Sequence, residues 1–101
     1  MYVVIWEYEV RPDASMRFEA MYGPQGEWVA LFRRYPGFIA TELLRGDGDR
    51  YLSIDRWESG QAYERFQRQA QEDYARLDAA GDALTLAERR IGAYTGAGDR
   101  P

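Results

Sequence analysis

The sequence predicts an α+β domain in which two helices cover one face of a four-stranded antiparallel sheet. Four short stretches alternate their side chains with a period of two, as strands do. Two longer stretches repeat apolar residues every three or four positions, as amphipathic helices do. Turn residues separate these stretches in the order β-α-β-β-α-β, which is the ferredoxin-like arrangement, and right-handed crossovers then place both helices on the same face.

The N-terminal half supplies the first strand and the first helix. The strand is expected over 2–10, with apolar side chains on both of its faces near its start. Asp13 is a candidate N-cap for the helix that follows. The segment 23–26 interrupts that helix, and Pro24 is predicted to be the first residue of a new helical segment, which Pro36 and Gly37 end.

The C-terminal half begins with a hairpin. Strands are expected over 38–45 and 50–58, and the Gly-Asp-Gly-Asp turn at 46–49 joins them. Ser59 then caps a second helix, and Gly81 is expected just past the end of that helix. The apolar face of this helix contains Tyr63, Phe66, Ala70, Tyr74 and Leu77. With a last strand over 86–94, one domain spans 1–95 and a flexible tail spans 96–101.

The composition limits the chemistry and the partners. The 101 residues contain no cysteine, which excludes disulfides and thiol chemistry and suits a cytoplasmic protein. They contain no histidine, so the commonest metal ligand and the usual base near neutral pH are absent. The 46–49 turn lacks the ligand spacing of a calcium loop, so no metal site is expected. The net charge of −4 and the lack of a long apolar run argue against nucleic acid and membrane as partners.

The sheet face opposite the helices is expected to form a homodimer interface. Two helices on one face leave the other face bare, and the first strand carries apolar residues on both faces. An exposed apolar surface of this size marks an interface. We therefore expect two sheets to pack face to face in a symmetric homodimer.

Three segments of the chain resemble the antibiotic biosynthesis monooxygenase family of dimeric α/β-barrel proteins. They are Trp6-Glu-Tyr-Glu-Val10, Tyr35-Pro-Gly-Phe38 leading into Thr41-Glu-Leu-Leu44, and Arg56-Trp-Glu-Ser59 leading into Ala62-Tyr-Glu-Arg-Phe66. The resemblance runs from about residue 2 to residue 94. It implies a homodimer that has, in each subunit, a pocket between helices and sheet.

The same resemblance implies two kinds of chemistry. Some members are quinol and polyketide oxygenases that use dioxygen without metal or flavin, so no cofactor is implied here. Other members degrade haem with an Asn, a Trp and a His, whose positions correspond to Trp6, Phe66 and Arg76 in this sequence. Without a histidine, haem ligation of that type is not possible.

Aromatic residues make up 15% of the chain and have two readings. They can line a pocket for a flat apolar or aromatic molecule, with tyrosine hydroxyls or indole N–H groups orienting a carbonyl. They can equally be ordinary core and dimer packing, because rings at helical and strand spacing usually are. The predicted walls of the pocket are Trp6, Trp28, Phe32, Trp57, Phe66 and Tyr74, and Tyr22 or Tyr63 is the predicted donor.

A carboxylate in the predicted third strand is the candidate base. Asp55 shares its strand face with Tyr51, Ser53 and Trp57, and a charge in a central strand is unusual. If that face meets the helices, Asp55 is placed to deprotonate a phenol or an acidic carbon. Glu7 and Glu42 are rivals for the role, and each carboxylate has an alternative reading as an ion-pair partner of Arg89, Arg90 or an arginine of the partner subunit.

The leading functional hypothesis is a cofactor-independent monooxygenase acting on an aromatic, quinol-like or polyketide-like compound. Its catalytic residues would be Asp55 as base and Tyr22 or Tyr63 as donor to the developing oxyanion. The alternatives are a non-catalytic dimeric binding protein for an apolar metabolite, and an isomerase or decarboxylase on the same scaffold. The reaction rests on analogy between folds.

Overall fold

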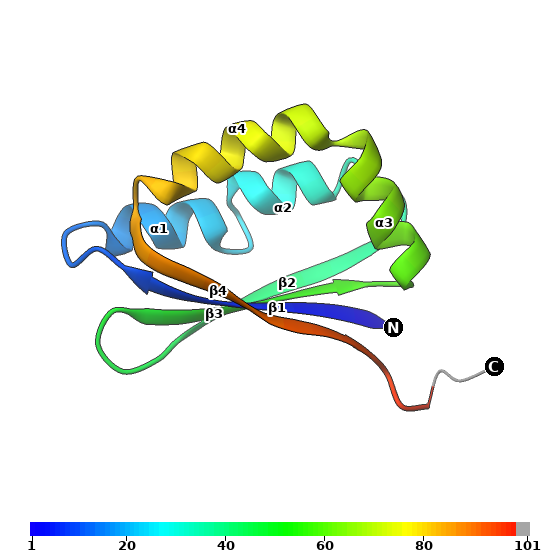
Figure 1. The fold of residues 1–101 in the computed structure, drawn as a ribbon, viewed down its shortest axis with the longest axis horizontal. Coiled ribbons are helices and arrows are strands. Elements are labelled where there is room, and N and C mark those ends of the chain that lie inside the picture. The colour runs from blue at the N-terminus through cyan, green and yellow to red at the C-terminus, as the bar shows by residue number, and fades with distance from the viewer. Residues whose placement is uncertain (99–101) are drawn as a thin grey trace.

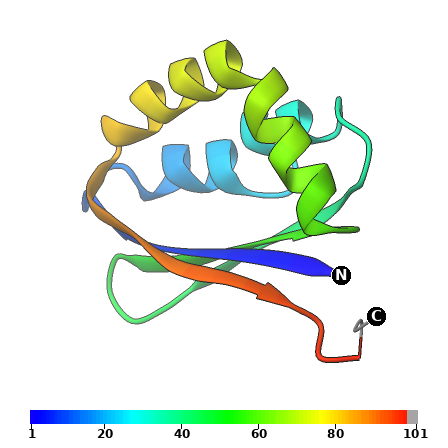
Figure 2. The same ribbon diagram turned by 45° about the vertical axis from the view of Figure 1, so that its right-hand side comes forward.

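A computed structural model describes residues 1–98 and confirms the ferredoxin-like fold (Figure 1). The strands form one antiparallel sheet in the order β2-β3-β1-β4. The elements in chain order are β1 (Tyr2–Val10), α1 (Ser15–Tyr22), α2 (Glu27–Phe32), β2 (Phe38–Arg45), β3 (Arg50–Trp57), α3 (Gly60–Gln69), α4 (Gln71–Asp82) and β4 (Thr85–Thr95). All helical segments lie on one face of the sheet, as the turned view in Figure 2 also shows.

The strand register places the candidate base in the middle of the sheet. Asp55 of β3 lies opposite Val4 of β1 on one side and opposite Thr41 of β2 on the other. Its neighbours two residues away, Ser53 and Trp57, are buried beneath the helices. Because alternate side chains of a strand point to the same face, Asp55 also faces the helices. The hairpin and the strand bounds predicted for β2 and β3 are confirmed to within one residue.

The first helical region differs from the prediction at both of its segment starts. The N-cap of α1 is Ala14, which makes no side-chain cap, so the assignment of Asp13 as cap is wrong. Pro24 lies in the turn between the two helices, and α2 begins only at Glu27 after Gly26. The extended backbone of Gly26 serves as the N-cap, and an added Cβ there would lie 2.1 Å from a backbone carbonyl oxygen of α1. Close approach of two backbones therefore sets the start of α2, and this is a tertiary constraint.

The second helix is divided into two segments at Ala70. Ser59 caps α3 as predicted, since its Oγ accepts a hydrogen bond of 3.1 Å from the amide of Ala62. Ala70 then leaves helical geometry while it stays buried, and α4 continues at a sharp angle to α3 (Figure 1). The predicted apolar face is shared between the two segments. Gly81 is a buried residue inside α4 and not the residue that follows it, because the helix runs to Asp82.

The core between sheet and helices is a continuous array of aromatic rings. Phe66 and Trp57 are fully buried with ring centroids 5.1 Å apart, and Phe32 packs edge-on against both. At the other end of the core, Phe18 stacks on Tyr22 at 4.2 Å. Burial of such rings stabilises the fold by area and by these edge and stacked contacts, about 0.5–1.5 kcal/mol per pair beyond area burial.

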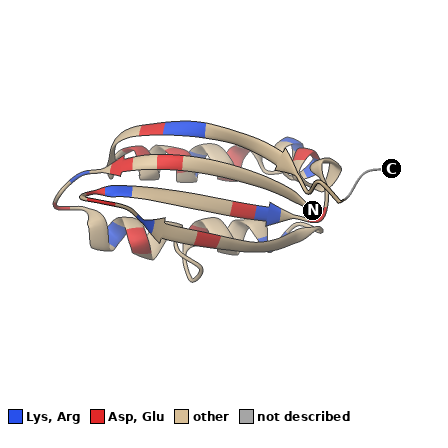
Figure 3. Ribbon diagram, turned by 90° about the horizontal axis from the view of Figure 1, so that it is seen from below, with Lys and Arg blue, Asp and Glu red and all other residues tan. Residues whose placement is uncertain are grey.

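No helix of the described chain covers the other face of the sheet (Figure 3). Side chains of β1 and β3 on this outer face include Ile5 and Ile54, which are directly paired and only partly buried. Leu44 and Tyr94 on the neighbouring strands are exposed. Two ion pairs, Glu7 with Arg89 and Glu42 with Arg56, also join strands whose register places these side chains on the outer face.

The C-terminal end returns to the start of the chain. The amide of Gly96 donates a hydrogen bond of 2.9 Å to the carbonyl oxygen of Met1. The predicted tail at 96–101 begins right after β4, and its residues 99–101 lie outside the described residues. Among the helices that the structure describes, none has the length and the apolar character that crossing a membrane requires.

Candidate active site

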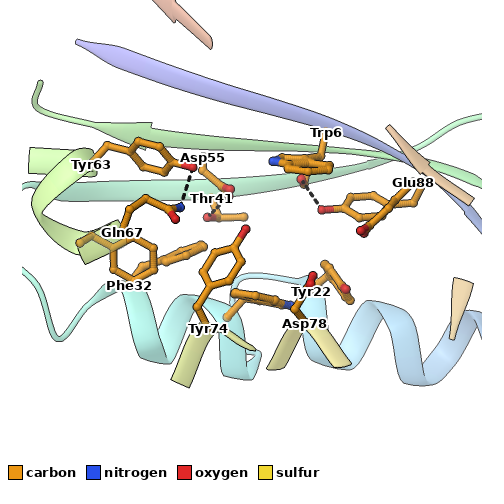
Figure 4. Close-up of a pocket in the computed structure, with 14 residues that line it drawn as sticks. Trp6, Tyr22, Phe32, Thr41, Asp55, Tyr63, Gln67, Tyr74, Asp78 and Glu88 are labelled. Atoms are coloured by element: carbon orange, nitrogen blue, oxygen red, sulfur yellow. Dashed lines mark hydrogen bonds between the residues drawn. The ribbon is translucent and has the colours of Figure 1, made fainter. Parts of the chain in front are cut away.

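A cavity of about 40 Å³ lies between the helices and the sheet. Every helix and strand of the fold contributes at least one lining residue, and Figure 4 shows how the labelled residues surround the space. A volume of this size holds about three water molecules at roughly 10–15 Å³ each, whereas sites for drug-sized ligands measure about 300–1,000 Å³. The rings that line the cavity therefore close most of the space that a polycyclic ligand would need.

Asp55 lines this cavity from the middle of β3. Its Oδ1 accepts a hydrogen bond of 2.7 Å from the Thr41 hydroxyl. Burial raises the pKa of the Asp55 carboxyl from 3.8 to about 6, and the Thr41 hydrogen bond only partly opposes this rise. A carboxyl with this pKa is ionised at neutral pH and is a stronger base than an ordinary aspartate, which is the property that a general base requires.

The two rival carboxylates do not reach the cavity. Glu7 pairs with Arg89 at 3.0 Å and Glu42 pairs with Arg56 at 3.4 Å, and both pairs lie on the outer face of the sheet. The alternative reading of Asp55 as an ion-pair partner of Arg89 does not apply, because Arg89 points away from the helices and forms its ion pair with Glu7. Of the three candidates, only Asp55 is placed to act on a ligand in the cavity.

Tyr63 lies close to Asp55 in Figure 4 and lines the same cavity. The Tyr63 hydroxyl accepts a hydrogen bond of 2.8 Å from Nε2 of Gln67, one turn later in α3. Since the amide supplies that proton, the tyrosine's own proton is available for a ligand oxygen. Burial raises the pKa of Tyr63, although the charge of Arg90 opposes the rise, so the hydroxyl remains a neutral donor.

Tyr22, the other predicted donor, sits at the opposite side of the cavity under α4. An added Cβ at Gly81 would lie 2.0 Å from the Tyr22 hydroxyl oxygen, so this hydroxyl occupies the space that glycine leaves open. Burial raises the pKa of Tyr22, and the nearby indole of Trp28 partly opposes the rise. The Trp28 N–H does not reach hydrogen-bond geometry and remains without a partner among the described residues.

Five of the six predicted aromatic walls line the cavity, namely Trp6, Trp28, Phe32, Phe66 and Tyr74. Trp57 is the exception, since it lies in the core, fully buried and outside the cavity lining. Both interpretations of the aromatic residues therefore apply, because the same rings line the cavity and pack on the core. Trp28 shows this double role, with its ring centroid 4.9 Å from that of Tyr74 and 5.9 Å from that of Phe32.

Several lining residues were not identified from the sequence. Thr41 and Gln67 are polar residues whose roles depend on cross-strand and helix neighbours. Asp78 of α4 and Glu88 of β4 also line the cavity, and burial raises the pKa of both carboxyls. Together with Asp82 they bring carboxylate oxygens within 4.8 Å of one another, a spacing that can hold a cation. The i, i+4 spacing of Asp78 and Asp82 was the available signal, but only the fold adds Glu88.

A family model for antibiotic biosynthesis monooxygenases matches residues 1–76 of the chain, which include β1 to α3 and most of the cavity lining. The chain belongs to the antibiotic biosynthesis monooxygenase family. This confirms the resemblance seen in the three sequence segments.

Solved structures of other family proteins have the same fold. SnoaB of Streptomyces nogalater, a cofactor-independent oxygenase, is 27% identical with a TM-score of 0.77, over 94% of this chain and 91% of that one. The monooxygenase from the gene ActVA-Orf6 of Streptomyces coelicolor, solved in complex with nanaomycin D, is 24% identical with a TM-score of 0.74, over 99% and 90% of the two chains. A search of curated protein sequences finds no match to this chain.

Proposed function

We propose that this family member is a cofactor-independent monooxygenase that acts on a flat, hydroxylated aromatic or polyketide-like compound held in the cavity. The observation that carries the proposal is Asp55, a carboxyl with a pKa near 6 on the wall of an aromatic cavity beside a tyrosine donor. The likeness to SnoaB supports the same reaction class.

In the proposed reaction, Asp55 removes a proton from a phenol or an acidic ring carbon, and the resulting carbanion or phenolate is electron-rich enough to reduce dioxygen. Carbon and oxygen combine to a hydroperoxide, which then loses water. The balance is R₂CH₂ + O₂ → R₂C=O + H₂O, so the substrate carbon supplies the electrons and one oxygen atom leaves as water. Tyr63 would donate a hydrogen bond to the substrate oxygen on which negative charge develops, which stabilises the anion before oxygen adds.

A polycyclic substrate requires the cavity to widen beyond 40 Å³. Tyr74 is the lining residue best placed to give way, since its side chain reaches into the cavity from α4 and is only partly buried (Figure 4). The break at Ala70 lets α4 shift without unwinding α3. Both features support entry of the substrate between α4 and the sheet.

The test is oxygen consumption with 1,8-dihydroxyanthrone, a flat phenol with an acidic CH₂ group, corrected for its spontaneous oxidation. We expect uptake by the wild-type protein and a loss of about 10²-fold or more in the Asp55→Asn variant, the scale of a general base. Glu42→Gln is the matched control, because it neutralises a carboxylate of the neighbouring strand on the outer face and should leave the rate unchanged.

Two outcomes would contradict the proposal. Unchanged uptake in Asp55→Asn would show that Asp55 is not the base. Binding of the anthrone without oxygen uptake by the wild-type protein would favour the non-catalytic binding function.

We further propose that two copies form a homodimer through the outer face of the sheet. The support is the partly exposed apolar surface of β1 and β3, which includes Ile5 and Ile54 and which no element of the described chain covers (Figure 3). An apolar surface of this kind favours association.

A further inference from the structure

The charged residues that line the cavity all have the same sign. They are Asp55, Asp78 and Glu88, and the lining contains no lysine or arginine. Within residues 1–98, none of the three carboxylates forms an ion pair. Arg90 lies opposite Trp6 in the sheet and outside the lining, and its charge acts on Tyr63. Carboxylates are thus the only charged groups that a ligand meets in the lining itself.

The three carboxylates stand at two ends of the space. Figure 4 shows Asp55 beside Tyr63 at one end, and Glu88 beyond Trp6 at the other. Asp78 joins Glu88, because their carboxylate oxygens and those of Asp82 lie within 4.8 Å of one another. An ionised carboxylate only accepts hydrogen bonds, so each end of the cavity offers acceptors.

A buried donor without a partner also lines the cavity. Trp28 is 7% exposed, and its indole N–H has no hydrogen-bond partner among the described residues. A buried N–H that lacks a partner is destabilising, so a ligand oxygen atom that accepts a hydrogen bond from it contributes to binding. A hydroxyl group of the ligand can serve both groups, because it can donate a hydrogen bond to a carboxylate and accept one from the indole N–H.

We propose that the cavity selects neutral flat aromatic compounds that carry a hydroxyl group at each end, and that it rejects analogues bearing a carboxylate. The proposal rests on the proposed function, since it names the substrate class of the same site. One hydroxyl would donate to Asp55, where the reaction begins. The other would donate to Asp78 or Glu88 and accept from Trp28. A carboxylate at that second position would be repelled by two like charges and would leave them without a donor.

The test is calorimetric binding of three matched naphthalenes at pH 7.5. They are 1,5-dihydroxynaphthalene, 1-naphthol and 5-hydroxy-1-naphthoic acid, which share a ring and differ only in the second polar group. We expect the diol to bind about fivefold more tightly than 1-naphthol, and the acid to bind at least about tenfold more weakly than the diol.

Variants assign the discrimination to the proposed residues. Glu88→Gln should strengthen binding of the acid about three- to tenfold, and should therefore reduce the difference in affinity between the acid and the diol. Trp28→Phe keeps a ring but removes the N–H, and should weaken binding of the diol. Glu72→Gln is the control, because it removes the same charge from an exposed position of α4 outside the cavity and should change neither affinity.

The outcomes separate this inference from the proposed function. If the acid binds as tightly as the diol, or if Glu88→Gln leaves the ratio of their affinities unchanged, the proposed selection by charge is wrong while the oxygenase proposal stands. If the diol binds selectively but no hydroxylated ring supports oxygen uptake, the oxygenase proposal fails and the selectivity stands. Failure of all three compounds to bind would overturn the selectivity.

Discussion

At the residue scale, the site depends on one carboxylate that the fold makes more basic. Asp55 is surrounded by buried neighbours on its strand face and has the Thr41 hydroxyl as its hydrogen-bond donor. Burial disfavours the charged form more than this one hydrogen bond favours it, so the pKa rises to about 6. The same shift has one consequence for activity and another for stability.

The proposed base predicts a simple pH profile. Asp55 must be ionised to accept a proton, so kcat/KM with an active substrate should rise about tenfold per pH unit below pH 6 and level off above it. The measurement is kcat/KM from oxygen uptake between pH 4.5 and 8, since this ratio reports the pKa of the free enzyme. An inflection near 4, the ordinary aspartate value, would exclude Asp55 as the titrating group.

The same carboxylate should weaken the folded state near neutral pH. A folded-state pKa raised from 3.8 to about 6 means that its contribution to stability is fully present below pH 3.8 and is lost as the pH rises through 6. Asp55→Asn keeps an oxygen that accepts from Thr41 and removes the charge. We expect the free energy of unfolding in urea to increase by about 1–3 kcal/mol at pH 8 and to match the wild type near pH 4. An Asn variant that is less stable at pH 8 would contradict this.

At the element scale, α4 is positioned by a contact at a single glycine. The Tyr22 ring from α1 reaches beneath α4, where only a residue without a Cβ leaves room for its hydroxyl. The sequence pattern assigned Gly81 to the end of the helix, because glycine commonly follows a helix. Packing of α4 on α1 decides otherwise, and the helix passes through the glycine.

This contact predicts a non-additive pair of substitutions. In a free helix, Gly81→Ala would be stabilising by about 1 kcal/mol, but here the new Cβ would lie 2.0 Å from the Tyr22 oxygen. We expect Gly81→Ala to destabilise the protein by about 1–3 kcal/mol, which is typical of overpacking. In a Tyr22→Phe background the hydroxyl is gone, and the same substitution should be much less harmful. A double-mutant cycle by urea unfolding measures the coupling, and strictly additive effects would refute the contact.

At the scale of the whole molecule, the helices leave one face of the sheet uncovered. The two faces of the sheet differ in their chemistry, since aromatic rings and Asp55 face the helices, while aliphatic side chains and two ion pairs occupy the outer face. The cavity and the proposed dimer interface therefore lie on opposite sides of the same strands. A substitution on one face of the sheet can therefore be tested without altering the side chains that line the other face.

The proposed dimer predicts a mass in solution close to twice 11.7 kDa. Ile54→Glu places a charge in the middle of the outer face and should convert the dimer to a monomer at micromolar concentration. Met16→Glu is the control, because Met16 on α1 is 87% exposed on the helical side. Light scattering coupled to size-exclusion chromatography measures both variants, and a monomeric wild-type protein would refute the interface.

Local sequence patterns determined the strands, the hairpin, the Ser59 cap and the fold class, because they depend on side-chain alternation and on turn and cap residues, whose effects act over a few positions. The family came from the resemblance of three segments to known proteins, which the family model confirms. The same alternation placed Asp55 on the strand face of Ser53 and Trp57. The sequence alone favoured Asp55 as the base but left Glu7 and Glu42 as rivals.

Only the tertiary structure decided which carboxylate meets the cavity, where the helices begin and break, and which acidic residues join Asp55. Glu7 and Glu42 are excluded as bases for a ligand in the cavity, because the strand register places them on the outer face of the sheet, where each pairs with an arginine. Glu88 reached the cavity because the α4–β4 turn returns the chain beside Asp78. The physical reason is that burial, backbone approach and charge proximity depend on residues distant in the chain, which no local pattern encodes.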